Sequence, residues 1–96
     1  MNIVIISGEI VSGIEFKFIY DRYGTKSKHT SISSCCIKLD NDSIIQIYGY
    51  DGMADFMYRH LKFGDLVICG GSIDSEGNIV IDEIENKGQQ NYFYVK

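Results

Sequence analysis

Aromatic rings and cations are interleaved through residues 16–28 of the sequence. Rings can stack on nucleobases and cations can pair with phosphates, and these are the two contacts that hold a single strand without reading its sequence. Phe16 and Phe18 share the apolar parity of this stretch, so we expect both rings in the core. The residues of the segment that we expect to contact nucleic acid are Lys17, Tyr20, Arg22, Tyr23, Lys26 and Lys28.

Tyr48 is a candidate stacking residue outside this segment. If Ile45 and Ile47 face the core, as their shared parity indicates, Tyr48 points away from the core and offers its ring to a base. The alternative is a tyrosine that packs at a contact between subunits. Lys38, at the far end of the preceding predicted strand, completes the set of expected nucleic-acid contacts.

The other reactive side chains are not spaced for catalysis or metal binding. Neither His29 nor His60 lies near a nucleophile or near ligand-spaced partners in the sequence, and His60 falls on the apolar stripe of a predicted helix. Cys35 and Cys36 are adjacent rather than arranged as C-x-x-C, and Cys69 makes an odd third, so we expect three small, buried or half-buried residues. We therefore expect no enzymatic activity, no metal site and no cofactor.

The formal net charge of -4 opposes binding to a polyanion, but the charges are unevenly distributed. Residues 17–38 contain five Lys and Arg side chains and one acid, whereas residues 74–85 contain five acids and no Lys or Arg. A polarised surface can bind a polyanion on its basic side despite the overall sign. The acids leave a second interpretation open, in which they face a basic protein; they are Asp74, Glu76, Asp82, Glu83 and Glu85.

Period-two alternation predicts one long strand over residues 2–18. Gly8 and Gly13 interrupt it, and a glycine inside a strand marks a bend through which one strand can serve two sides of a small barrel. Residues 21–27 are typical of a loop. Further strands are predicted by β-rich runs between turn signals, at residues 28–39, 44–48, 66–73 and 79–84.

One segment changes to a helical period, because Met53, Phe56, Met57, His60 and Leu61 fall on one stripe. Asp51 is expected to cap the start of this helix and Gly64 to end it. Three strands, one helix and two strands follow each other in the order of a five-stranded OB barrel. We therefore predict an all-β fold with one short helix. The OB domain would span residues 1–85, and residues 86–96 would form a tail or an extra edge strand.

Several segments are similar to single-stranded DNA-binding (SSB) proteins of the bacterial and organellar type. Residues 2–10, with Glu15 and the run Phe16-Lys17-Phe18, resemble the opening of that family, and Tyr48-Gly49 resembles the aromatic-glycine pair that ends its third strand. The similarity covers residues 2–85 in order, and its later parts are the helix-to-strand junction at 61–67 and the strands at 70–73 and 80–84.

This resemblance implies non-catalytic binding of single-stranded DNA in replication, recombination or repair, with RNA as the alternative nucleic acid. It also implies a homo-oligomer, a dimer or a tetramer, assembled through the first strand, where Ile3, Ile5 and Val11 lie on the outer parity. The chain departs from the family in having no tryptophan and no acidic tail. The alternative is an OB domain for protein contacts, such as a primosome-like accessory module that binds little nucleic acid.

No run of residues approaches the roughly 18 to 20 apolar residues that cross a bilayer. The first residues lack the basic flank and the cleavage site of a signal peptide. From the sequence we therefore expect a protein of the cytoplasm, or of the interior of an organelle such as a plastid, that is not secreted and has no membrane partner.

Overall fold

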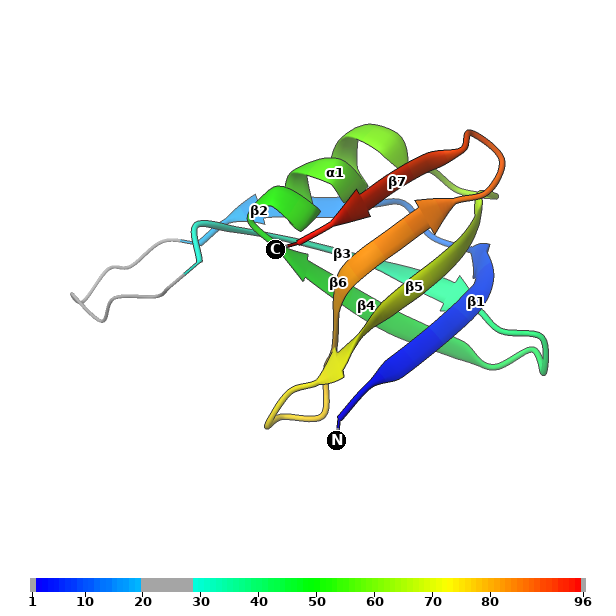
Figure 1. Cartoon of the computed structure of the whole chain (residues 1–96), viewed down its shortest axis with the longest axis horizontal. Coiled ribbons are helices and arrows are strands. Elements are labelled where there is room, and N and C mark those ends of the chain that lie inside the picture. The colour runs from blue at the N-terminus through cyan, green and yellow to red at the C-terminus, as the bar shows by residue number, and fades with distance from the viewer. Residues whose placement is uncertain (1, 20–28, 96) are drawn as a thin grey trace.

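Seven strands and one helix form in the computed structural model, which describes residues 2–19 and 29–95 (Figure 1). The predicted loop at residues 21–27 lies outside the described residues. In chain order the elements are β1 (Val4–Ile10), β2 (Glu15–Phe18), β3 (Ser31–Lys38), β4 (Ile44–Tyr50), α1 (Gly52–His60), β5 (Leu66–Ile73), β6 (Ile79–Asn86) and β7 (Asn91–Tyr94).

The predicted first strand bends into β1 and β2. β1 pairs with β5 along its length and touches β3 only at its end, whereas β2 pairs with β3 alone. At the crossing, a Cβ on Gly8 would collide with the backbone of Lys38, so only glycine permits this close approach. One bent stretch of chain thus serves two sides of the barrel, as its glycines predicted.

Two short ladders close the barrel. The strand order is β1-β5-β6-β4-β3-β2, with an additional pairing of β1 to β3. β1 meets β3 through two antiparallel residue pairs, and β4 meets β6 through two parallel pairs; we call these ladders the seams. With β1 and β2 counted as one strand, the architecture is a five-stranded barrel with its helix between the third and fourth strands, so the predicted OB fold is confirmed.

The core lies between the barrel strands and α1. Ile10, Ile37 and Ile47 come from three different strands and are fully buried, and α1 contributes Met53 and Met57. α1 is the one helix in the described part of the chain, and it is too short to cross a membrane. The apolar parity of the strands and the stripe of the helix therefore converge on one core, as in other small barrels.

Phe18 contradicts the prediction that both phenylalanines of β2 are buried. Phe16 is half-buried and its ring lies 5.3 Å from that of Tyr58 on α1, but Phe18 is 78% exposed and meets Phe16 edge-to-face at 5.2 Å. Both rings point to the side of the sheet that carries α1. The helix covers only Phe16, because β2 continues past the end of α1.

Asp51 occupies the N-cap position of the helix, as predicted, whereas the predicted helix end at Gly64 is wrong. Asp51 makes no side-chain cap; its carboxylate accepts hydrogen bonds from Thr30 instead. The helix ends at His60, because Leu61 is already extended, and Gly64 adopts its positive φ of 93° in the turn that follows. His60 is exposed, with its ring 4.8 Å from that of Phe56.

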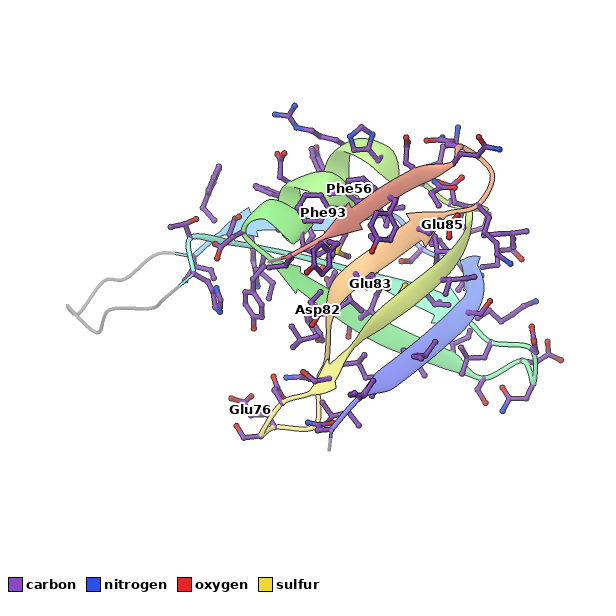
Figure 2. The ribbon with its side chains drawn as sticks, in the orientation of Figure 1. Phe56, Glu76, Asp82, Glu83, Glu85 and Phe93 are labelled. Atoms are coloured by element: carbon purple, nitrogen blue, oxygen red, sulfur yellow. The ribbon has the colours of Figure 1, made fainter. Side chains whose placement is uncertain are left out.

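The C-terminal residues 91–94 form β7, which pairs antiparallel with β6. Phe93 turns inward from β7 and stacks on Phe56 of α1, with ring centroids 5.2 Å apart (Figure 2). β7 therefore connects the last barrel strand to the helix.

Candidate nucleic-acid interface

The register of β2, β3 and β4 places a row of polar and aromatic side chains on the side of the sheet that faces away from the core. Tyr48 lies opposite Ser34, and Tyr50 lies opposite Ile32. Because alternate residues share a face, the outward residues form one surface. We call it the outer face, and its residues are Glu15, Lys17, Ile32, Ser34, Gln46, Tyr48 and Tyr50. Six of them, all but Tyr50, line a depression of about 480 Å³.

Tyr48 occupies the centre of the outer face. Ile47 beside it is fully buried and Ile45 packs against the core, whereas Tyr48 is half-buried on the opposite side of the strand. The orientation expected from parity is therefore confirmed. Its role as a stacking residue stays a prediction.

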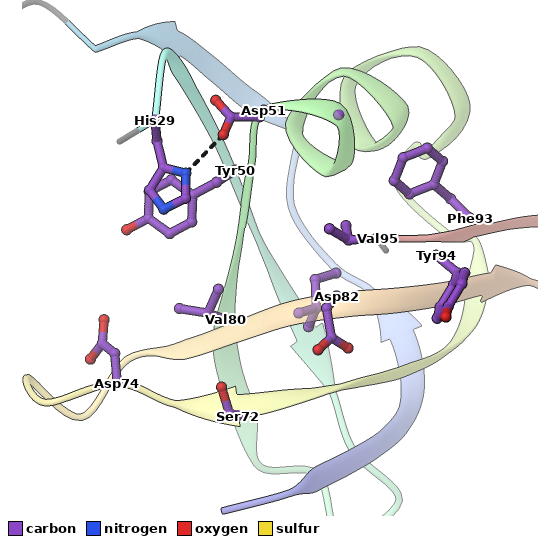
Figure 3. A pocket seen from close by; sticks show the side chains of 12 residues that line it. His29, Tyr50, Asp51, Ser72, Asp74, Val80, Asp82, Phe93, Tyr94 and Val95 are labelled. Atoms are coloured by element: carbon purple, nitrogen blue, oxygen red, sulfur yellow. Dashed lines mark hydrogen bonds and ion pairs between the residues drawn. The ribbon is translucent and has the colours of Figure 1, made fainter. Parts of the chain in front are cut away.

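A second pair of rings lies at the end of the outer face, where the imidazole of His29 stacks on Tyr50 with centroids 4.3 Å apart and 20° between planes. His29 Nδ1 is 2.8 Å from Oδ2 of Asp51 (Figure 3). Asp51 Oδ1 accepts a hydrogen bond from the Thr30 N–H at 2.7 Å. These contacts hold both rings in place.

The hydrogen bond from the Thr30 N–H, followed by that from His29, lowers the pKa of Asp51 to about 2. Its carboxylate is therefore ionised at neutral pH and fixes the orientation of His29. The same charge opposes a phosphate at this end of the face.

Sequence reasoning overlooked this second pair of rings. Tyr50 has the same parity as Tyr48, so strand parity predicts an outward-facing ring at both positions. The sequence expectation for His29 concerned acid-base chemistry and metal binding, not stacking. Its stacking depends on how the chain enters β3 beside the end of β4, which no local pattern contains.

The two described lysines of the predicted site lie at different ends of the sheet. Lys17 is exposed on the outer face, opposite Ile32. Lys38 follows Ile32 by six residues on β3, which places it roughly 20 Å away, and its Nζ lies 3.9 Å from Asp42 Oδ1. The structure therefore does not bring Lys38 together with Lys17. Tyr20, Arg22, Tyr23, Lys26 and Lys28 lie outside the described residues, and their roles stay predictions.

The cysteines are buried or half-buried and free, as expected. Burial, followed by a neighbouring thiol, raises the pKa of Cys35 and of Cys69 to about 12, so both are protonated at neutral pH. Over residues 2–19 and 29–95, no three His, Cys, Asp or Glu side chains gather as a metal site.

No protein-family model matches the sequence, and no curated protein matches it. Among solved structures, the SSB domain of a protein from Synechococcus sp. superposes with a TM-score of 0.71 at 16% identity, over 88% of this chain and 93% of that one. The protein priB from Ralstonia solanacearum superposes with a TM-score of 0.67 at 18% identity, over 90% and 98%. At these identities the likeness is one of fold. The chain therefore has an OB fold similar to that of an SSB domain and of priB.

Proposed function

We propose that the chain binds single-stranded DNA without chemistry, in replication, recombination or repair, with RNA as the alternative nucleic acid. The observation that carries the proposal is the outer face, which presents Tyr48, the stacked pair of Tyr50 and His29, and Lys17 on the same side of the sheet. Tyr48 and Tyr50 are two residues apart on one strand, about 6.6 Å, so Tyr48 can receive one base and the Tyr50–His29 pair a second. The OB fold supports this reading, because its sheet surface is a common platform for oligonucleotides.

Few cations accompany these rings. Among the described residues of the outer face, Lys17 is the one lysine or arginine; Glu15 is two residues away on the same strand, and Asp51 directly follows Tyr50. Phosphate contacts would therefore come from Lys17 and from the predicted basic segment at 20–28. We expect weak to moderate affinity that falls steeply with salt.

A titration of fluorescent oligo(dT) tests the proposal. At about 50 mM salt the anisotropy is expected to rise on adding protein, and the affinity should fall as salt is raised, because counterions compete for the phosphates. Oligo(rU) under the same conditions compares RNA with DNA. Absence of binding to either at about 50 mM salt would contradict nucleic-acid binding.

A second candidate is a protein-binding OB module, such as a primosome-like accessory factor. It is favoured by the net charge of -4 and by the acids between residues 74 and 85, which form no ion pair within the described part of the chain. This second candidate predicts a folded protein that does not bind oligo(dT) at low salt. The same titration therefore decides between the two candidates.

We also propose a homo-oligomer. Ile5 on the outer side of β1 is 77% exposed, and Ile3, which directly precedes the strand, is 63% exposed. Exposed isoleucines at the start of a strand favour burial against a second copy.

A further inference from the structure

A pocket of about 600 Å³ opens where β4 and β6 separate, beyond the seam that joins them (Figure 3). β6 leaves β4 after Val80 and continues beside β5 and β7, while β4 ends at Tyr50 and turns into α1. The pocket is the space left between β4 and β6 where they separate. Its volume is in the range of pockets that hold small molecules or the side chains of a peptide.

The walls of the pocket are mainly apolar and aromatic. Val80 and Ile81 come from β6, Tyr50 from β4, and Phe93 and Val95 from the C-terminal segment. Phe93 is held by its stacking on Phe56 of α1, and the N–H of Val95 donates to the Asp82 carbonyl at 2.8 Å. Two ordered contacts, one between β7 and α1 and one between Val95 and β6, therefore hold the wall formed by the C-terminal segment.

Carboxylates surround the mouth of the pocket. Asp51, Asp74 and Asp82 line it from three different segments. Asp51 is held by Thr30 and His29, and Asp74 accepts hydrogen bonds from the N–H groups of its own turn, which lower the pKa of both carboxyls. Asp82 is exposed and forms no ion pair with any described residue.

The acidic surface continues from Asp82 along β6 (Figure 2). Glu83 lies opposite Tyr94 and Glu85 lies opposite Tyr92, with all four side chains exposed. Two carboxylates of β6 thus lie opposite two tyrosine rings of β7 on the surface beside the pocket. A phosphate would be repelled here, whereas an extended cationic chain would meet complementary charge.

We propose that this pocket binds a basic segment of a partner protein, with an arginine side chain inside it and the flanking residues along the acidic surface of β6. A guanidinium is planar, so it can lie against the rings of Tyr50 or Tyr94 while it pairs with the carboxylate of Asp82. The proposal does not depend on DNA binding: the pocket includes His29 and Tyr50 of the outer face, but Ser72, Asp82 and Phe93 lie outside that face.

Fluorescein-labelled hexa-arginine is the probe, and hexa-citrulline of the same length is its uncharged control. Wild-type protein is expected to bind the first and not the second. Asp82→Asn should weaken the affinity for hexa-arginine about five-fold, and Asp40→Asn should leave it within about two-fold. Asp40 is the matched control, because it is an exposed acid in the β3–β4 turn and its substitution changes the net charge equally.

Ser72→Phe tests the pocket itself, because it adds a ring at a residue that lines the pocket without altering charge. It is expected to abolish hexa-arginine binding while the circular dichroism spectrum is retained. The proposal is overturned if hexa-citrulline binds equally, if both Asn variants lose affinity equally, or if Ser72→Phe binds like wild type. It is also overturned if Asp82→Asn abolishes self-association in sedimentation and leaves peptide affinity unchanged, since the occupant would then be a second copy.

Oligo(dT) binding is measured on the same variants. Asp82→Asn and Ser72→Phe are expected to keep wild-type affinity for oligo(dT). Loss of peptide binding alone identifies the pocket as a separate protein-binding site. A wild-type protein that binds hexa-arginine but not oligo(dT) would contradict the proposed DNA binding and leave the pocket assignment intact.

Discussion

Tyr48 contributes through the face of its ring if it stacks on a base. Tyr48→Ala is therefore expected to weaken oligo(dT) binding by about 1 to 3 kcal/mol while the slope of log affinity against log salt stays nearly unchanged. Anisotropy titrations at several salt concentrations measure both quantities. If the variant instead unfolds or dissociates while each folded subunit binds normally, Tyr48 is a structural contact.

Lys17→Ala is expected to change the salt dependence of oligo(dT) binding, which Tyr48→Ala leaves nearly unchanged. Losing one phosphate contact on a single strand should flatten the salt slope by about 0.7. Lys62→Ala is the matched control, because Lys62 is exposed after the end of α1 and lies outside the expected nucleic-acid contacts. A slope that changes equally in both variants would indicate a diffuse effect of charge rather than a contact at Lys17.

Asp51 makes the stability of the fold depend on pH. Its folded-state pKa of about 2 lies below the ordinary value of 3.8, so its contribution is present above pH 3.8 and is lost as the pH falls toward 2. Asp51→Asn should therefore unfold at lower urea concentration than wild type at pH 7, with a difference that shrinks at pH 2. The effect is modest, since the side chain is 41% exposed. A difference that is constant across this range would contradict the assignment.

At the scale of elements, the contact between α1 and β4 depends on Gly49. A Cβ at this position would lie 2.5 Å from Cγ of Met53 and 2.6 Å from Sδ of Met57, both in the core. Gly49→Ala is expected to lower the free energy of unfolding by about 1 to 3 kcal/mol, the usual cost of overpacking. Urea denaturation measures it. Gly13→Ala is the control, because nothing lies within 4 Å of its added Cβ, and a similar loss in both variants would refute the steric explanation.

Local periodicity predicted the elements because each strand and the helix bury one face. Periodicity does not reveal which other element of the fold covers the buried face. Phe18 has the parity of a core residue, but it extends past the helix that shields Phe16. Asp51 has the sequence context of a helix cap, but Thr30 and His29, about twenty residues earlier, supply better partners. The outward tyrosine of the site followed from parity, whereas the stacked His29 required the tertiary arrangement.

At the scale of the whole molecule, the exposed isoleucines of β1 predict self-association. Ile5→Glu should convert an oligomer into a monomer, because a charge cannot be buried in an apolar interface without a partner. Sedimentation velocity over a range of concentrations measures this. Phe63→Glu, also at an exposed apolar residue, is the control. A wild-type chain that sediments as a monomer at every concentration would contradict the prediction.

The two seams divide the barrel into two leaves, β1-β5-β6-β7 and β2-β3-β4, each joined to the other by only two residue pairs at either side. Few backbone hydrogen bonds must break for the leaves to separate, so breathing motions should concentrate at the seams. A single strand on the outer face would contact one leaf and leave this motion unchanged. A peptide in the pocket would touch Tyr50 on one leaf and Asp82 on the other. The peptide would therefore hold the two leaves together and slow amide hydrogen exchange at the seams, whereas the single strand would not.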